Sequence, residues 1–167
     1  MGLLKTLDIN DRKDEIIDSY GGIFDNMKFP IGFTFNIKPS KRIRDCNGIR
    51  KSISLEKSHI ENIWSVFTTN VLHATYPRYM RIAHNRPPLA IGGFELGISY
   101  SNPHIHCVVD NVNDIPCYTF KWVIQQCLQN TKDQTSWLGK SIHFNNHTDR
   151  NYVSYFLKSS EFVSLYC

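Results

Sequence analysis

The stretch Ile91-Gly-Gly-Phe-Glu-Leu-Gly-Ile-Ser-Tyr-Ser-Asn-Pro-His-Ile-His-Cys-Val-Val109 decides the fold. Its two ends, residues 91–98 and 104–109, have the apolar and β-branched character of strands, and Ser101-Asn102-Pro103 is typical of the turn between them. The pattern therefore predicts two strands that pair as an antiparallel hairpin.

Two histidines stand close together on the second of these strands. Because side chains alternate between the faces of a strand, His104 and His106 share one face, while Ile105 and its odd-numbered neighbours enter the core. Glu95 precedes His104 by nine residues. In a hairpin that turns near residues 99–102, its carboxylate lies opposite one of the histidines, with Cβ atoms roughly 5 Å apart.

One carboxylate and two neutral imidazoles on a single face predict a partly filled metal site with room for a substrate oxygen. Open coordination that is rich in oxygen favours Mg²⁺ or Mn²⁺, although imidazole also binds Zn²⁺, so the metal's identity stays open. The alternative interpretation is a pair of hydrated surface histidines beside an unrelated carboxylate.

Helical and strand periodicities continue along the chain. Ser58 and Thr148 are expected to cap two of the helices. Helices are predicted over residues 8–20, 58–76, 117–129 and 148–159, and further strands over 31–37 and 141–145. This order predicts one α+β domain over residues 1–167, with a central antiparallel sheet of about five strands flanked by helices.

The composition excludes several classes of protein. The 167 residues include 19 Lys+Arg and 15 Asp+Glu, a formal net charge of +4, and 41% of them are hydrophobic, which supports a folded core rather than disorder. No apolar run approaches the roughly 20 residues of a membrane helix, so no membrane association is expected. The five cysteines form no Cys-x-x-Cys pair, and the first residues lack a secretion signal, which together favour an intracellular protein.

Positive charge is concentrated in two stretches. The first lies within 14 residues with Asp45 as its single acid, and it comprises Lys38, Lys41, Arg42, Arg44, Arg50 and Lys51. The second has Arg78, Arg81 and Arg86 interleaved with Tyr76 and Tyr79. Cations beside aromatic rings suit a nucleic-acid backbone and its unpaired bases, whereas the plainer interpretation is a solvated loop.

The last predicted helix has two different faces. Val153, Phe156 and Leu157 form the stripe that docks on the sheet, and Asn151, Tyr155 and Lys158 lie opposite. A tyrosine nucleophile needs a nearby cation to favour its phenolate, and Lys158 follows Tyr155 by one turn. Tyr152, one turn before Tyr155, is a candidate for a second nucleophile or a base-stacking ring.

Three motifs in this order resemble those of HUH endonucleases: Phe33-Thr34-Phe35-Asn36, Pro103-His104-Ile105-His106-Cys107-Val108-Val109 and Tyr155-Phe156-Leu157-Lys158. More narrowly, the chain is similar to the replication-initiator (Rep) nuclease domain of small circular single-stranded DNA viruses and related plasmids. The resemblance covers about residues 30–160 and implies an HUH/RRM-like fold.

The resemblance also implies roles for individual residues. Glu95, His104 and His106 would bind Mg²⁺ or Mn²⁺, Tyr155 would be the nucleophile, and Lys158 would orient the phosphate. The first motif, with Thr34 and Asn36, would help to build the DNA-binding surface. The other DNA-contacting residues would be Lys38, Lys41, Arg42, Arg44, Arg50, Lys51, Arg78, Arg81 and Asn151.

The activity implied by the resemblance is nicking and joining of single-stranded DNA at a replication origin, which in this family can be a hairpin, to initiate rolling-circle replication. It proceeds through a 5′-phosphotyrosine link and leaves a 3′-hydroxyl for a polymerase. The expected partners are single-stranded DNA and the host replication machinery, in the cytoplasm of a prokaryote or the nucleus of a eukaryotic host.

The resemblance is incomplete, and other functions stay open. We expect no helicase domain, because Gly139-Lys140-Ser141 ends like a phosphate-binding loop but Gln134 stands where that loop needs glycine. One alternative is a single-tyrosine HUH transposase. Others are a cupin-like small-molecule metalloenzyme, with Asp110 and His143 as further ligands, and a non-catalytic single-strand-binding module.

Overall fold

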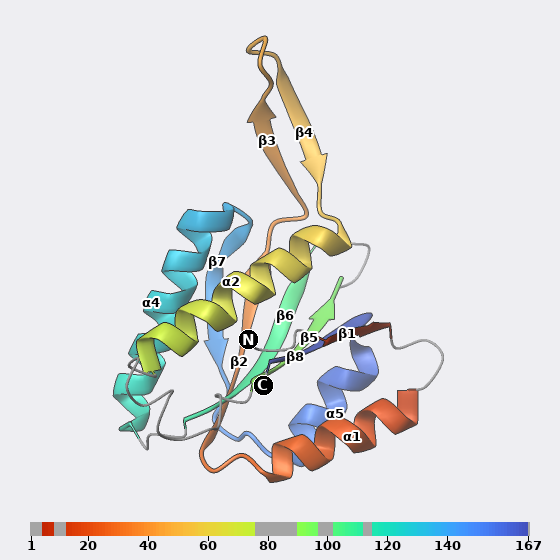
Figure 1. Cartoon of the computed structure of the whole chain (residues 1–167), viewed down its shortest axis with the longest axis vertical. Coiled ribbons are helices and arrows are strands. Elements are labelled where there is room, and N and C mark those ends of the chain that lie inside the picture. Colours follow the sequence, from red (N-terminus) through yellow and green to blue (C-terminus); the bar gives the residue numbers. More distant parts are fainter. Residues whose placement is uncertain (1–4, 9–12, 76–89, 97–101, 112–114, 167) are drawn as a thin grey trace.

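The computed structural model describes residues 5–8, 13–75, 90–96, 102–111 and 115–166. Their main sheet has six strands in the order β1-β8-β5-β6-β2-β7, and every pair of neighbours is antiparallel (Figure 1). These strands are β1 (Lys5–Asp8), β2 (Pro30–Ile37), β5 (Ala90–Glu95), β6 (His104–Asp110), β7 (Leu138–Phe144) and β8 (Phe162–Tyr166). The helices are α1 (Lys13–Asp25), α2 (Lys57–Thr75), α4 (Cys117–Thr135) and α5 (Arg150–Ser159). The predicted α+β class with an antiparallel sheet is confirmed.

Helices cover both faces of the main sheet, and each layer has its own apolar core. The residues of β6 show the division, since Ile105, Cys107 and Val109 pack with α2 and α4, whereas Val108 packs with α1 and α5. His104 and His106 lie on the second of these faces, because side chains alternate along the strand. The expected core positions on this strand are confirmed.

Two adjacent glycines of β5 let the helix layers approach the sheet closely. A Cβ on Gly92 would lie 2.6 Å from the Trp64 ring of α2, and a Cβ on Gly93 would lie 2.6 Å from the Phe156 ring of α5 and still closer to the Ser160 hydroxyl. The position of α5 on the sheet therefore depends on the missing side chain at Gly93.

Gly93→Ala is expected to destabilise the protein by about 1–3 kcal/mol, because the added methyl group overpacks the contact with α5. The matched control is Gly22→Ala, since a Cβ on Gly22 meets no atom within 4 Å and alanine favours a helix by up to about 1 kcal/mol over glycine. Urea unfolding of both variants measures the difference. Equal stabilities of the two variants would contradict the close packing of α5.

Several element boundaries differ from the predicted ones. Helix α1 spans Lys13–Asp25 rather than residues 8–20, and β7 begins at Leu138 rather than at 141. Helix α4 continues to Thr135 instead of ending at 129, because Thr131 and Thr135 are buried and their hydroxyls donate to carbonyls one turn earlier. Most of the turn expected near residues 99–102 falls outside the described residues.

The predicted cap of the last helix is wrong by one residue. Asp149, not Thr148, is the N-cap of α5, and its carboxylate accepts a hydrogen bond of 2.8 Å from the backbone N–H of Tyr152. Thr148 instead accepts a 2.7 Å hydrogen bond from the backbone N–H of Gly32 and so ties the start of this helix to β2.

The first basic stretch is a hairpin and not a loop. Strands β3 (Ser40–Arg44) and β4 (Arg50–Ser54) form a separate two-stranded sheet that projects from one end of the molecule (Figure 1). It leaves β2 shortly after Ile37 and returns to α2, so both of its ends are anchored on the main body.

Candidate metal centre

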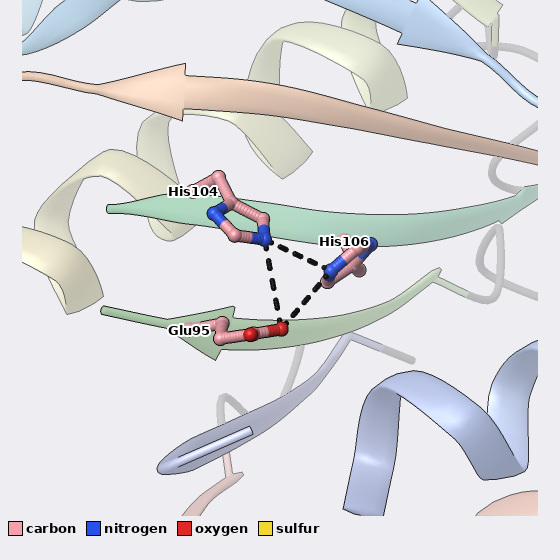
Figure 2. Close-up of side chains that lie close together, drawn as sticks. All are labelled: Glu95, His104 and His106. Atoms are coloured by element: carbon pink, nitrogen blue, oxygen red, sulfur yellow. Dashed lines mark hydrogen bonds and ion pairs between the residues drawn. The ribbon is translucent and has the colours of Figure 1, made fainter. Parts of the chain in front are cut away.

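The pairing of β5 with β6 brings the three predicted metal ligands together. Glu95 is the direct partner of His104, and His106 pairs with Gly93 one step along the ladder. Glu95 and both histidines point toward one another from adjacent strands (Figure 2). The expected opposition of the carboxylate and a histidine is confirmed.

The three ligand atoms form a compact triangle. The two Nε2 atoms are 3.1 Å apart. Glu95 Oε2 lies 3.6 Å from Nε2 of His104 and 3.4 Å from Nε2 of His106. Spacings of this size would let Glu95, His104 and His106 each supply one ligand atom to a single ion at ordinary metal–ligand distances of about 2.1 Å. Among the described residues this is the group of three that could hold a metal ion.

The second nitrogen of each ring is held by a neighbour that fixes the ring's orientation. Nδ1 of His106 lies 2.9 Å from the Thr34 hydroxyl, and Nδ1 of His104 lies 2.9 Å from the carbonyl oxygen of Asn102. The Asn102 carbonyl can only accept, so Nδ1 of His104 donates to it, and Nε2 is the ring nitrogen directed at the triangle. Support of this kind is typical of metal-binding histidines.

Thr34→Val is expected to weaken Mn²⁺ binding by about 10- to 100-fold, because it removes the hydroxyl that orients His106 but keeps the shape of the side chain. Thr34→Ser, which keeps a hydroxyl, is expected to retain most of the affinity. Isothermal titration of Mn²⁺ into each purified variant makes the comparison. If valine and serine bind Mn²⁺ alike, the hydroxyl has no orienting role.

The surroundings favour the uncharged form of His106. Partial burial and the neighbouring His104 lower the pKa of this imidazole, and Glu95 only partly opposes that effect. A neutral imidazole has a free lone pair, which is the form that ligates a metal.

A second carboxylate, Glu161, lies close to the triad and was not identified from the sequence. Its backbone N–H donates a 2.8 Å hydrogen bond to the carbonyl of Phe94. The β5–β8 register pairs Phe94 with Phe162, so one further step places Glu161 beside Glu95. Partial burial and then the Glu95 carboxylate raise the pKa of Glu161. Glu161 therefore adds negative charge close to the triad, although it is not one of the three grouped ligands.

Both tyrosines of α5 reach the same centre. The ring centroid of Tyr155 lies 6.5 Å from that of His106, and the Tyr152 ring lies 6.3 Å from it. Phe156 stacks on His106 at 5.9 Å, nearly parallel, so it fixes the helix against the imidazole. Lys158 and Asn151 are exposed, as expected for the outer face of this helix.

The tyrosines differ in their surroundings. Tyr155 is 65% exposed, whereas Tyr152 is half-buried and packs edge-on against Phe156. Burial raises the pKa of Tyr152 to about 12. Its phenol donates a weak 3.4 Å hydrogen bond to the carbonyl of Phe33, which ties it to β2.

The predicted DNA-contacting cations fall into two groups. Three lysines have partners within the protein, since Lys38 donates to the Ser136 carbonyl at 3.0 Å, Lys41 lies 4.8 Å from the Trp137 ring centroid, and Lys51 pairs with Asp45 at 3.0 Å. Arg42, Arg44 and Arg50 are exposed on the hairpin. Asn36 donates to Asn102 beside the metal centre. Arg78 and Arg81 lie outside the described residues.

The additional ligands of the cupin alternative are not at the triad. Asp110 is buried and accepts hydrogen bonds from the backbone N–H groups of Lys28 and Phe29 at 3.0 and 2.9 Å. It is four residues from His106 along β6, about 13 Å away. His143 is on β7, across β2 from the triad, and the helices on both sheet faces also differ from the mainly β architecture of cupins.

No protein-family model, curated protein or solved structure matches the chain. In the part of the chain that the structure describes, no helix is long and apolar enough to cross a membrane.

Proposed function

We propose that the protein is a metal-dependent endonuclease that nicks and rejoins single-stranded DNA through a covalent bond to Tyr155. The observation that carries the proposal is an exposed tyrosine, Tyr155, whose ring centroid lies 6.5 Å from that of His106, a member of the Glu-His-His triangle. A nucleophile beside a site for a Lewis acid is the minimum that phosphoryl transfer to a protein side chain requires.

Exposure favours Tyr155 over Tyr152 as the nucleophile. A phosphodiester must approach the phenol oxygen, and Tyr155 is 65% exposed, whereas Tyr152 is half-buried. The pKa of Tyr152, about 12, also makes its phenolate rarer than that of an ordinary tyrosine. Tyr152 is better suited to support His106 and Phe156 than to attack the phosphate.

In the proposed reaction, the Tyr155 oxygen forms a bond to phosphorus, and the bond from phosphorus to the 3′-oxygen of the preceding nucleotide breaks. The phenol loses its proton, and the 3′-oxygen takes up a proton and leaves as a hydroxyl. The products are a 5′-phosphotyrosine and a free 3′-hydroxyl. The new bond is again a phosphodiester, so a DNA 3′-hydroxyl can reverse the step and rejoin the ends without ATP.

Glu95, His104 and His106 would hold the metal, which we propose is Mg²⁺ or Mn²⁺. When bound, such an ion polarises a phosphate oxygen and offsets charge that develops during phosphoryl transfer. The two histidines offer neutral nitrogen donors, and Glu95 with the nearby Glu161 supplies negative charge. Lys158, one helical turn beyond Tyr155, would hold a phosphate oxygen and stabilise the phenolate.

A free 3′-hydroxyl opposite a protein-bound 5′ end suits the start of rolling-circle replication, because a polymerase extends the first and the enzyme retains the second for joining. We therefore propose a single-stranded replication origin as the substrate and a host polymerase as the partner that uses the product. This role would place the protein at the site of DNA replication.

The test is a covalent adduct between the protein and DNA. A library of labelled single-stranded oligonucleotides with a randomised centre is incubated with the protein and Mn²⁺, then resolved on a denaturing gel. The expected result is a labelled band at the mass of protein plus DNA, which EDTA prevents. Non-covalent binding without that band at any Mn²⁺ concentration would favour a single-strand-binding module instead.

A further inference from the structure

The two faces of the β3–β4 hairpin carry different side chains. The register pairs Lys41 with Ile53 and Ile43 with Lys51, so these four share one face. The opposite face carries only arginines and serines, all exposed: Ser40, Arg42, Arg44, Arg50, Ser52 and Ser54. The positive charge of the hairpin is therefore not spread evenly around it.

The mixed face is satisfied within the protein. Ile53 packs against the main core, the Lys41 ammonium lies over Trp137, and Lys51 is paired with the Asp45 carboxylate. This ion pair and two backbone N–H groups lower the pKa of Asp45, so the carboxylate stays charged at neutral pH. The lysines of this face thus have roles in holding and shaping the hairpin.

The arginine face differs from the mixed face in its charge pairing. Among the described residues, none of Arg42, Arg44 and Arg50 forms an ion pair with a carboxylate. Arg44 is also the direct cross-strand partner of Arg50. Like charges in directly opposed positions destabilise a strand pair, so this arrangement weakens the hairpin unless an anion lies against it.

The hairpin is closed by an ordered turn. The Asp45 carboxylate accepts hydrogen bonds from the backbone N–H groups of Asn47 and Ile49 at 3.0 and 2.9 Å, and Gly48 adopts the left-handed conformation with φ of +76°. At the other end, Leu55 donates to the Pro39 carbonyl at 2.9 Å. The arginines are thus presented by a preorganised ribbon, which loses little entropy on binding.

We infer that the arginine face of the β3–β4 hairpin binds duplex DNA by entering the major groove. A B-form major groove is about 12 Å wide and admits a two-stranded ribbon, whose strands are about 4.8 Å apart and, at five residues each, about 17 Å long. Arginines contact guanine edges or phosphates, and serine hydroxyls bind phosphate oxygens. The major groove of duplex RNA is too narrow and deep for such a ribbon.

The hairpin's position links this duplex to the metal centre, an inference that rests on the proposed nuclease activity. Asn36 of β2 pairs directly with His104. Strand β3 begins at Ser40, four residues after Asn36, so at most about 13 Å of chain separates the start of the hairpin from the residue that pairs with His104. Figure 1 shows the hairpin projecting from this end of the main sheet. The substrate it fits is a junction, with a duplex on the hairpin and a single strand at the triad.

The test compares the parent protein with Arg42→Gln/Arg44→Gln/Arg50→Gln. The control, Lys28→Gln/Lys57→Gln/Lys140→Gln, removes the same charge from exposed sites elsewhere. Fluorescence anisotropy measures binding to three probes of about 20 nucleotides and mixed sequence: duplex DNA, single-stranded DNA and duplex RNA. This length gives the DNA duplex about two helical turns. We expect the arginine variant to lose about 10- to 100-fold in affinity for duplex DNA, with little change for the other two probes, and the control to lose much less.

Two results would overturn the inference: equal duplex affinity of the arginine variant and the control, or an equal loss on single-stranded DNA. A melting temperature at or above that of the parent protein shows that the variant is folded, because the substitutions relieve the opposed charges of Arg44 and Arg50. The adduct assay on single-stranded DNA separates this inference from the nuclease proposal. If no protein forms an adduct but the arginine variant alone loses duplex binding, the nuclease proposal fails and the duplex site stands.

Discussion

Tyr155→Phe is expected to abolish the covalent adduct with single-stranded DNA, at least a thousandfold below the parent protein, because it removes the only atom proposed to attack phosphorus. The variant lacks one exposed hydroxyl, so its melting temperature and its affinity for single-stranded DNA are expected to match those of the parent. Adduct formation is quantified on denaturing gels across a time course, and binding is measured by anisotropy in the same buffer.

The matched control is Tyr152→Phe, which removes a hydroxyl from the same helix one turn away. This variant loses the weak hydrogen bond to the Phe33 carbonyl, and a slower reaction is expected because α5 is less firmly held. The adduct should still form. If Tyr152→Phe abolishes it and Tyr155→Phe does not, the nucleophile is Tyr152 and the argument from exposure is wrong.

His104→Ala and His106→Ala are each expected to remove specific Mn²⁺ binding and, with it, adduct formation. In the parent protein, Mn²⁺ at 100 times its dissociation constant stabilises the fold by about 2.7 kcal/mol, which raises the melting temperature by roughly 5–10 °C for a domain of this size. Neither variant should show this rise. Differential scanning calorimetry with and without Mn²⁺ measures it.

His143→Ala is the matched control, because His143 is a histidine of the same sheet, on β7 across β2 from the triad, and is not part of the triad. It should keep the full thermal shift. In EDTA, His104→Ala is expected to melt within a few degrees of the parent, whereas His106→Ala is expected to melt lower, because the His106 ring packs against Phe156 and both tyrosines of α5. A thermal shift that survives both substitutions would place the ion elsewhere.

The triad could be predicted from the sequence because it depends on local rules. Alternation along a strand puts His104 and His106 on one face, and the antiparallel pairing of β5 with β6 sets Glu95 opposite His104. The three motifs also lie on the elements expected for them. The positions of Tyr152 and Tyr155 could not be predicted from local rules alone. They depend on how closely α5 approaches the sheet, which is set by the contact between Gly93 of β5 and Phe156 of α5.

Features that depend on distant pairing could not be predicted. Strands β1 and β8 pair residues at the two ends of the chain, such as Leu7 with Val163, and neither strand has a strong pattern of its own. Glu161 was missed for this reason, because it lies beside Glu95 only through the β5–β8 register.

The basic stretch shows how a pattern of charge can be interpreted too uniformly. Six cations looked equivalent in the sequence, yet Lys38, Lys41 and Lys51 have partners within the protein. Regular strand alternation within this stretch, with Asp45-x-x-Gly48 as a turn, would have been the signal for a hairpin. That hairpin leaves the arginines on one face.

The central claim is a phosphodiester bond between DNA and Tyr155, and peptide mapping of the adduct tests it most directly. The adduct is digested with a nuclease and a protease, and the peptides of α5 are sequenced by mass spectrometry. We predict a nucleotide attached through its 5′-phosphate to Tyr155, with Tyr152 unmodified. A nucleotide on any other residue, or one attached through its 3′-phosphate, would contradict the proposal.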